Sequence, residues 1–472
     1  MTVLVERGVR PDGAVSGPPG LPTALRDRAV RTACRTVVLA ALVVILASWA
    51  TGGGLADLGG WATGLTSLGR LTGVLASLLM LVQVLLMARV PGLERAFGQD
   101  RLAVLHGLVG FTSFTGMLAH VGLITWGYAA GDLAAAPGEL WDLTVTYPGM
   151  LLAAAGTACL VLVTATSLRA ARARMRYESW HLLHLYAYLG VGLALPHQLW
   201  TGQEFLASTA RTVFWWTAWA LTAAAVLVWR VAVPLYRTLH HRLVVTSVVP
   251  EGDGCVSVYL AGEHLAELGV RAGQFLTWRF LTGTGWTRAH PYSLSAAPDG
   301  RSLRITVKDL GDGTAELPGL RPGTKVLIEG PFGRLTARAR SRPGVVLIGA
   351  GVGITPLRAL AEELAADPAG ADVVVLHRFT GPPLFAGEFA ALARARRLTL
   401  VPLPGRRRAP DSWLGPGVGP GDDVAVLRAR VPDVAERDVY LCGPTPWTDL
   451  VQRTLLTAGT PADRVHVEAF GW

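Results

Sequence analysis

The sequence has few cysteines and no pattern that would join them into a site. Its 472 residues include only Cys34, Cys159, Cys255 and Cys442, with no CxxC pair. This excludes a zinc site built on paired cysteines, a four-cysteine iron–sulfur motif and a disulfide framework. The sequence also has no EF-hand loop, so nothing in it indicates calcium activation.

Charge is scarce as well, and it is unevenly distributed. Charged residues make up 16% of the chain and hydrophobic residues 51%, with the hydrophobic residues concentrated before residue 236. The net charge of +9 does not indicate nucleic acid binding, because the arginines flank the hydrophobic segments, as membrane topology signals do. The chain is too long for one domain, and we expect it to divide near residue 236.

Six hydrophobic stretches follow a Gly- and Pro-rich tail, and each is expected to form a membrane-spanning helix. They are residues 36–56, 71–88, 102–131, 143–168, 180–203 and 212–229. Arginines cluster before the first stretch and after the second, fourth and sixth, whereas the other loops are acidic or nearly neutral. The positive-inside rule then predicts a multi-pass protein of the cell (inner) membrane with both termini in the cytoplasm.

The third stretch has no Asp, Glu, Lys or Arg over 30 residues, yet it contains His106 and His120. These histidines are 14 residues apart, which is about 21 Å along a helix and nearly one face. Ionisable residues inside a membrane are rare and by default suggest function. A structural histidine that only hydrogen-bonds to a neighbour is the alternative.

The fifth stretch contains His181, His184 and His197, and the last two are 13 residues apart. That separation is about 20 Å of helix, so the two stretches could pair histidines at two depths. Imidazole is a natural axial ligand of haem iron. Thirteen residues of straight helix turn by about 220°, so a shared face requires a correction such as a kink at Pro196. Helix rotation does not exclude His181, whereas depth favours His184.

Two arginines flank the outer ends of predicted spans. Arg70 lies at the outer end of the second span, and Arg211 lies just before the sixth. We expect both to be interface anchors. Either could instead bring positive charge to an electron acceptor, where a cation stabilises a developing anion.

After about residue 240 the pattern changes to short β-rich runs and Gly/Pro turns. Strands at residues 243–249, 255–260, 274–280, 303–307 and 325–329 predict a small β-barrel. Strands at 345–348, 373–377 and 439–442 alternate with helices at 356–365 and 388–396, which predicts a parallel sheet. The fold class is therefore multi-domain: an all-α six-helix transmembrane bundle, a β-barrel and an α/β Rossmann-like domain.

The first of these later strands runs into a glycine-rich turn and a helix. Gly349, Gly351 and Gly353 precede Thr355 and Pro356. Glycines at this place let a pyrophosphate approach the backbone N–H groups at a helix N-terminus. The pattern favours a dinucleotide site over a plain tight turn.

The soluble motifs together resemble the ferredoxin–NADP reductase superfamily. With the six spans, the chain from about residue 30 resembles the ferric reductase and NADPH oxidase family, bacterial type. The motifs are His290-Pro291-Tyr292-Ser293, Gly311-Asp312-Gly313-Thr314, Glu329-Gly330-Pro331-Phe332-Gly333, Leu441-Cys442-Gly443-Pro444 and Glu468-Ala469-Phe470-Gly471-Trp472. The expected domains are a disordered cytoplasmic tail (1–29), a transmembrane haem domain (30–236), an FAD-binding barrel (237–341) and an NAD(P)-binding domain (342–472).

The resemblance implies roles for individual residues. Those implied for FAD are His290, Pro291, Tyr292, Ser293, Lys308, Gly313, Thr314 and Trp472. Those implied for NAD(P) are Gly349, Gly351, Gly353, Thr355, Arg378, Cys442, Gly443 and Pro444. Ser293, Cys442 and Phe470 are implied in catalysis, with Phe470 or Trp472 covering the flavin. Two b-type haems are implied on His106, His120, His184 and His197, and this resemblance selects His184 over His181.

The function implied is a transmembrane NAD(P)H-dependent oxidoreductase of NADPH oxidase or ferric-chelate reductase type. Electrons from cytosolic NADPH or NADH would pass through FAD and two haems to oxygen or ferric iron outside. Arg378 could bind the 2′-phosphate of NADPH, although Phe379 and Pro382-Pro383 depart from the family pattern. Two other functions stay open: an electron-donating membrane subunit for a periplasmic partner protein, and a haem-free membrane-tethered flavin reductase.

Overall fold

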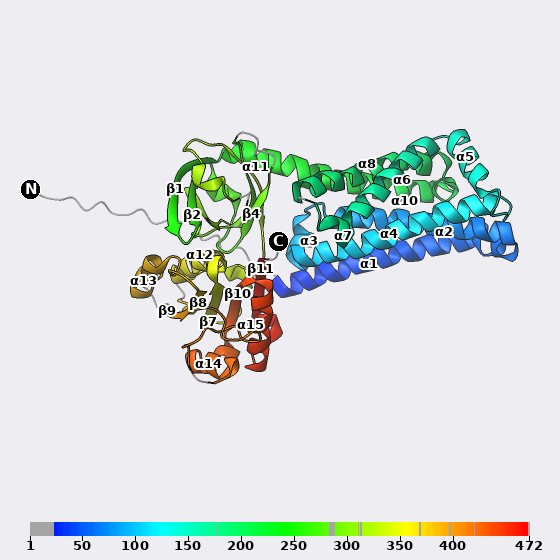
Figure 1. Ribbon diagram of the computed structural model, residues 1–472. Helices are drawn as coiled ribbons and strands as arrows, with labels where there is room; N and C mark the ends of the chain where they lie inside the picture. Colours follow the sequence, from blue (N-terminus) through cyan, green and yellow to red (C-terminus); the bar gives the residue numbers. More distant parts are fainter. Residues whose placement is uncertain are drawn as a thin grey trace, which may run out of the picture.

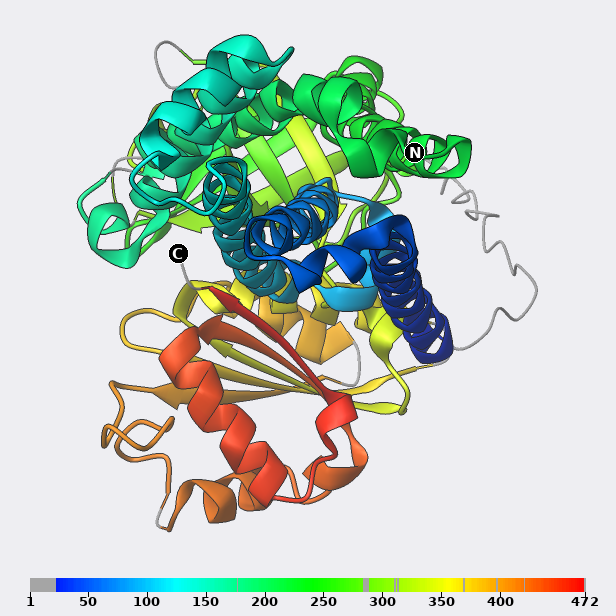
Figure 2. The same cartoon turned by 90° about the vertical axis from the view of Figure 1, so that its right-hand side faces the viewer.

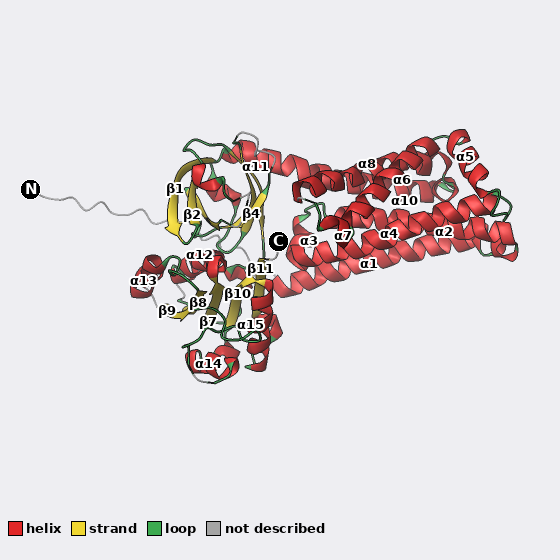
Figure 3. Cartoon of the chain, viewed as in Figure 1, coloured by secondary structure: helices red, strands yellow, loops and turns green. Residues whose placement is uncertain are grey.

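The computed structural model describes residues 23–175, 177–282, 288–309, 311, 314–367, 370–395, 398–419 and 421–470. A bundle of long helices lies at one end of the molecule, and two smaller lobes lie at the other (Figure 1). The strands are confined to the lobes (Figure 3). Viewed along the bundle, the C-terminal lobe lies to one side of the helices, and the other lobe lies behind them (Figure 2).

The N-terminal half is helical. Its helices are α1 (Thr23–Trp49), α2 (Trp61–Leu86), α3 (Pro91–Phe97), α4 (Gln99–Tyr128), α5 (Ala136–Thr146), α6 (Met150–Ser167), α7 (Arg169–Arg172), α8 (Tyr177–Thr201), α9 (Gln203–Leu206), α10 (Thr209–Val226) and α11 (Val233–His241). Among the described residues, five helical segments are long and apolar enough to cross a membrane. These are Leu25–Gly54, Trp61–Leu86, Gln99–Tyr128, Met150–Ser167 and Thr209–His241. The chain is therefore a membrane protein.

Each of the six predicted spans falls on a helix, but six crossings are not confirmed. Helix α8 is 25 residues long, yet it is not among the five apolar segments. Its three histidines and Pro196 make it less apolar than its neighbours. The fourth span also begins later than expected. Residues 136–146 form the separate helix α5, and Gly149, at a φ of +83°, stands between α5 and α6.

Glycines allow the helices to pack closely in pairs. A Cβ atom on Gly127 of α4 would lie 2.8 Å from the backbone N of Thr66 in α2. A Cβ atom on Gly156 of α6 would lie 2.6 Å from the carbonyl oxygen of Gly190 in α8. Small residues at such crossings let helix backbones approach each other within a membrane. The bundle therefore contains two tight helix pairs, α2–α4 and α6–α8.

The first lobe contains two three-stranded antiparallel sheets, ordered β1-β2-β5 and β4-β3-β6. The strands are β1 (Val244–Gly252), β2 (Cys255–Ala261), β3 (Phe275–Phe280), β4 (His290–Ser293), β5 (Ser302–Lys308) and β6 (Val326–Phe332). Both sheets contribute to one buried core that includes Leu260, Trp278 and Ile305. Single bridges, such as Leu294 with Ile305, connect the sheets. All five predicted strands are present, but a closed barrel is not confirmed.

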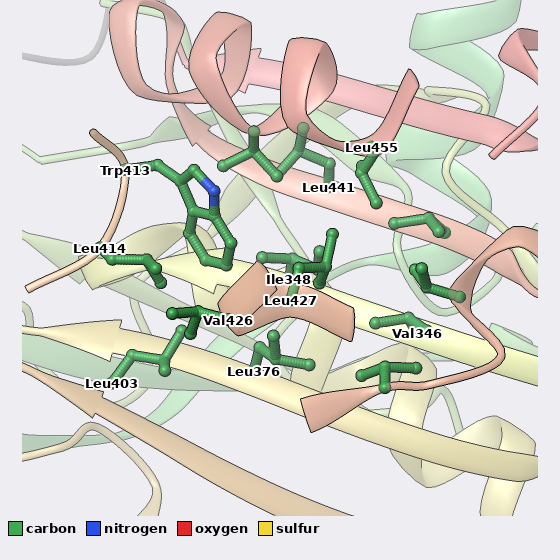
Figure 4. Close-up of a cluster of buried hydrophobic side chains, with 14 of the residues drawn as sticks. Val346, Ile348, Leu376, Leu403, Trp413, Leu414, Val426, Leu427, Leu441 and Leu455 are labelled. Atoms are coloured by element: carbon green, nitrogen blue, oxygen red, sulfur yellow. The ribbon is translucent and has the colours of Figure 1, made fainter. Parts of the chain in front are cut away.

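The second lobe contains a five-stranded parallel sheet in the order β11-β10-β7-β8-β9. Its elements are β7 (Gly344–Ala350), α12 (Ile354–Ala365), β8 (Asp372–Phe379), α13 (Ala386–Ala395), β9 (Leu398–Pro404), α14 (Asp423–Arg430), β10 (Asp438–Pro444), α15 (Thr445–Thr457) and β11 (Val465–Phe470). Figure 4 shows the core on one face of the sheet, where Trp413 packs near Leu441 and Ile348. The predicted βαβ series is present, with β9, β11, α14 and α15 in addition.

Candidate functional site

Four of the histidines implied as metal ligands meet in two pairs inside the bundle. The ring centres of His106 on α4 and His184 on α8 lie 5.9 Å apart. Those of His120 and His197, on the same two helices, lie 6.2 Å apart. One turn before His197 is Ala194, whose carbonyl oxygen lies 3.1 Å from the ring. Both pairs form even though a straight helix would turn His184 and His197 away from each other.

The same nitrogen atom is engaged in all four rings. The Nδ1 atom of His106 lies 3.1 Å from the Gln83 carbonyl oxygen, and that of His120 lies 2.8 Å from the Gly69 carbonyl oxygen. The Nδ1 atom of His184 lies 3.2 Å from the hydroxyl of Ser167. Within the described residues, no hydrogen-bond partner occupies the Nε2 atoms of these four rings. Metal-ligating histidines typically hold Nδ1 this way and leave the other nitrogen for the metal.

The spacing of the rings fits a metal between them. Two imidazoles that hold one ion from opposite sides at about 2.0–2.1 Å would have ring centres roughly 6 Å apart. The measured separations of 5.9 and 6.2 Å agree with this value. The donor chemistry also fits, since paired imidazoles are axial ligands of haem iron. The four residues therefore pass the test for two bis-histidine haems.

One glycine on α2 and one between α5 and α6 make room for the outer pair. A Cβ atom on Gly73 of α2 would lie 2.5 Å from Nδ1 of His120. A Cβ atom on Gly149 would lie 2.8 Å from the backbone N of His197. Sequence reasoning missed these glycines, because nothing in a lone sequence shows which helix faces which histidine.

His181 lies one turn before His184 on α8, towards the junction of the bundle with the first lobe. The charges that act on it belong to Arg230, Arg279 and Glu329. Glu329 forms ion pairs with Arg230 at 3.6 Å and with Arg279 at 3.4 Å. Phe332, in the same Glu329–Gly333 motif, also contacts the bundle. The guanidinium of Arg89, which follows α2, lies 4.3 Å from its ring centre. The segment predicted to close the flavin domain therefore faces the bundle.

The predicted flavin motif forms strand β4 and part of a small sheet. Ser293 pairs in register with Phe275, and Phe275 pairs with Phe332. The Trp278 indole N–H donates to the Tyr292 carbonyl oxygen at 2.9 Å. The hydroxyls of Tyr292 and Ser293 are buried, and neither has a partner among the described residues. Burial also raises the pKa of Tyr292. Two orphaned buried hydroxyls fit a polar ligand such as a flavin.

The other predicted flavin contacts are partly engaged within the protein. The Lys308 ammonium forms an ion pair with Asp253 at 2.7 Å, and the Thr314 hydroxyl donates to Asp309 at 2.9 Å. The rings of His290 and Tyr292 are nearly parallel, with centres 5.7 Å apart. Gly313 and Trp472 lie outside the described residues. Phe470 ends strand β11, where its backbone pairs with Pro444.

The glycine turn of the second lobe, Gly349 to Gly353, meets the end of strand β10. Gly353 has no room for a side chain, because a Cβ atom would lie 2.5 Å from the Cys442 carbonyl oxygen and 2.9 Å from Cα of Gly443. Gly349 pairs in register with Cys442. Gly351 has a φ of +54°, a conformation that glycine adopts easily. The hydroxyl of Thr355 donates to the Val352 carbonyl oxygen at 2.9 Å and caps this turn.

A partly buried acid lies beside Cys442. Glu468 on β11 is the register partner of Cys442 on β10. Burial raises the pKa of Glu468 to about 8, and the negative charge of Asp100 at the start of α4 adds to this. Burial and Glu468 together raise the pKa of the Cys442 thiol, so it stays protonated. In the sequence Glu468 stands out only as part of the C-terminal motif, and the alternating pattern of residues 465–470 is the signal for its strand.

Arg378 lies on strand β8, where it pairs in register with Ala350 at the start of the glycine turn. Its Nε atom is buried without a hydrogen-bond partner in the described part of the chain. Burial and the positive charge of Arg407 lower the pKa of Arg378. Beside it, burial lowers the pKa of His377 to about 4, so this imidazole is neutral. Arg378 and Arg407 therefore lie near each other beside the glycine turn.

Three charged residues from different elements join the two lobes. Glu388 of α13 forms ion pairs with Arg304 of β5 at 2.8 Å and with Arg358 of α12 at 2.5 Å. Both guanidinium groups are buried, and both donate to the Ser295 carbonyl oxygen. Ser295 is only two residues after Ser293, so this network lies next to the predicted flavin motif. No sequence signal links residues so far apart.

At the end of the bundle away from the lobes, the two arginines predicted at the outer ends of spans both form ion pairs. Arg70 forms an ion pair with Asp57 and donates to Gln203 at 2.9 Å. Arg211 forms an ion pair with Glu204 at 2.8 Å and donates to the Ser48 carbonyl oxygen. Arg70 immediately follows Gly69, whose carbonyl oxygen holds His120. Arg70 is therefore the arginine next to the outer histidine pair.

Comparison with known proteins agrees with this arrangement. Residues 72–195 match the ferric reductase like transmembrane component family, a range that includes His106, His120 and His184. A flavohemoprotein of Xylella fastidiosa is 29% identical over 237 residues, which cover 49% of this chain and 58% of the relative. The ferredoxin reductase component of a 3-ketosteroid-9-alpha-monooxygenase from Mycolicibacterium smegmatis is 32% identical over 206 residues, or 42% of this chain and 55% of the relative.

The chain combines a ferric reductase-like transmembrane component with a ferredoxin–NADP reductase-like module. The chain spans somewhat more than half the length of the curated relatives named above. Among solved structures, the FAD/NAD-binding domain of a nitric oxide dioxygenase from Vibrio cholerae is 28% identical, with a TM-score of 0.39, and covers 49% of this chain and 100% of that chain.

Proposed function

We propose that this chain is an electron-transfer oxidoreductase that carries electrons across the membrane. It would take them from cytosolic NAD(P)H and deliver them to oxygen or ferric iron on the other side, as an NADPH oxidase or ferric-chelate reductase does. The observation that carries the proposal is the pair of histidine pairs at two levels of one bundle, 5.9 and 6.2 Å between ring centres. A carrier confined to one side of the membrane would need one level only.

The bound groups proposed are FAD, NADPH or NADH, and two b-type haems. His106, His184, His120 and His197 would hold the haems. Tyr292 and Ser293 would hold the flavin, and Gly349, Gly351 and Gly353 would approach the dinucleotide. When bound, FAD supplies the exchange between hydride and single electrons, and haem iron supplies one-electron carriage.

The protein's own residues position these groups and manage protons. The carbonyl oxygens of Gln83 and Gly69 fix the ring orientation of the histidines and raise their basicity as ligands. Glu468, with a pKa of about 8, holds a proton on its carboxyl group near neutral pH beside Cys442. It would therefore be a group that can hold or release a proton near the working pH beside the place proposed for the nicotinamide.

The acceptor would bind near the outer histidine pair. Arg70 is adjacent to the glycine that holds His120, and its positive charge would stabilise an anion developing there. Its partners Asp57 and Gln203 fix the guanidinium in place. We propose that the protein lies in the cell membrane with both termini in the cytoplasm. The end of the bundle that contains Arg70 would then face away from the cytoplasm. The proposed domains are residues 30–236, 237–341 and 342–472.

Proteoliposomes with the reductase lobes facing outward test this proposal. NADPH is added outside, with ferric citrate and a ferrous-specific chelator trapped inside, and the lumenal ferrous complex and superoxide are followed. We expect lumenal reduction in the wild type and its loss in His120→Ala, with direct reduction of external ferricyanide retained. If the wild-type protein contains no haem and reduces only the external ferricyanide, it would instead be a membrane-tethered flavin reductase. Haem reduction without any lumenal product would indicate a subunit that serves a periplasmic partner.

A further inference from the structure

A cluster of metal-ligating side chains lies at the junction between the bundle and the first lobe. His240 is near the end of α11, whereas His264 and Glu267 belong to the loop and short 3-10 helix that follow β2. The nitrogen and oxygen ligand atoms of these three residues all lie within 4.8 Å of one another. The three residues lie apart from the redox groups described above.

Each oxygen of the Glu267 carboxylate faces one imidazole. Its Oε2 atom is 2.9 Å from Nε2 of His240, and its Oε1 atom is 3.6 Å from Nδ1 of His264. Ligand atoms around a tetrahedral zinc ion at about 2.0–2.1 Å would be separated by roughly 3.3 Å. The two histidine–carboxylate spacings bracket that value, and all three ligand atoms lie within 4.8 Å of one another. Two histidines and one glutamate also form the protein half of a zinc site with one open position.

The packing of the rings does not suit a simple ion pair. The rings of His240 and His264 are stacked, with centres 4.7 Å apart and an interplanar angle of 14°. Both rings face the same carboxylate, whereas an ion pair needs only one of them. Tyr236 stacks on His240 from the same helix, with centres 5.1 Å apart. A bound cation would give both imidazoles a role as ligands.

The surrounding charges permit a cation. Arg242 is largely exposed, and Glu263 pairs with it at 3.5 Å, which offsets its charge. His241 is buried, with Nδ1 3.2 Å from the Glu263 carbonyl oxygen, so it adds no ligand. The side chains of His264 and Glu267 are 54% and 63% exposed, so an ion could enter from solvent.

We propose that His240, His264 and Glu267 bind a divalent transition-metal ion of the kind that imidazole and carboxylate share, with zinc as the reference ion. The ion would join α11, which leads out of the bundle, to the first lobe. It would act as a clip across this junction rather than as a redox centre.

Zinc binding tests the proposal directly. The full-length protein, purified in detergent without a polyhistidine tag and cleared of metal with EDTA, is dialysed against Zn²⁺ and analysed for zinc. We expect one zinc per wild-type chain. Outer-shell changes alone weaken metal binding by about 10–100-fold, so His264→Ala and Glu267→Gln should each weaken it at least about 100-fold. Glu263→Gln is the matched control, an exposed carboxylate one residue from His264, and should bind like the wild type.

The thermal unfolding midpoint tests the clip itself. Ligand binding to the folded state raises the midpoint, so zinc should raise it in the wild type and in Glu263→Gln but not in Glu267→Gln. A wild-type chain that binds no zinc, variants that bind it equally well, or zinc that binds without raising the midpoint would each overturn the proposal. Unfolding midpoints measured without zinc show whether the variants are folded.

Discussion

The ring centres of His120 and His197 lie 6.2 Å apart, and the Gly69 carbonyl oxygen holds the first ring at Nδ1. This relationship joins three helices at the outer level of the bundle. His106 and His184 repeat it at the inner level, with Gln83 supplying the carbonyl oxygen. The account of electron transfer depends on these two levels.

Replacing one histidine of the outer pair should remove one haem. We expect His120→Ala and His197→Ala to lower the haem-to-flavin ratio of the purified protein from two to one. His181→Ala is the control and should keep both haems, because His181 lies at the junction with the lobes. Haem is measured as its pyridine complex and flavin after release. A ratio of two in His120→Ala would contradict the assignment.

Gly73→Ala should disturb the same level without removing a ligand. The added Cβ would lie 2.5 Å from Nδ1 of His120, so the ring or α2 must move. Overpacking of this kind typically costs about 1–3 kcal/mol. We expect a lower haem content or a shifted midpoint potential of one haem. Gly122→Ala on α4 is the matched control, because its Cβ would meet nothing within 4 Å. Equal behaviour of the two variants would count against the close approach.

Much of this site could be predicted from the sequence, and parts could not. The charge-free segment with His106 and His120 and the arginine pattern predicted the two levels, because depth and orientation follow from spacing and loop charge. Gly73 and the Glu388 network could not be predicted, since they depend on contacts between residues far apart in the chain. The separate helix α5 was missed because residues 143–149 carry no charge, although Pro148 and Gly149 mark a turn. That the Ser293 hydroxyl is buried without a hydrogen-bond partner among the described residues could be seen only in the structure.

Glu468 should make stability depend on pH. Its pKa of about 8 in the folded protein lies above the ordinary value of 4.5, so between these values the folded state binds more protons than the unfolded state. Stability from this group is therefore full below about pH 4.5 and falls as pH rises towards 8. The thermal unfolding midpoint should fall less between pH 5.5 and 8.5 in Glu468→Gln. Asp100→Asn should lie between it and the wild type, and parallel profiles for all three would refute the assignment.

The second arginine near the dinucleotide turn should select the nucleotide. Arg407 lies close enough to Arg378 to lower its pKa, and together they offer charge for a 2′-phosphate. We expect Arg407→Gln to raise KM for NADPH about tenfold while KM for NADH changes little. The NADH reaction with ferricyanide is the internal control. A similar change for both nucleotides would remove Arg407 from this role.

The lobes should separate more easily without Glu388. Its loss leaves the buried guanidinium groups of Arg304 and Arg358 without their shared carboxylate, which costs about 3 kcal/mol. We expect Glu388→Ala to lower the unfolding midpoint and to increase protease cleavage between the lobes. Glu263→Ala breaks an exposed ion pair worth at most about 1 kcal/mol and should change little. Equal midpoints for the two variants would contradict this view.

The absorbance spectrum of the purified protein, recorded without oxygen before and after NADPH is added, tests the central claim most directly. The account predicts a bis-histidine Soret band that shifts to its reduced position on NADPH addition, with two haems for each flavin. A flavin spectrum with no Soret band, from cells supplied with ample haem, would contradict it.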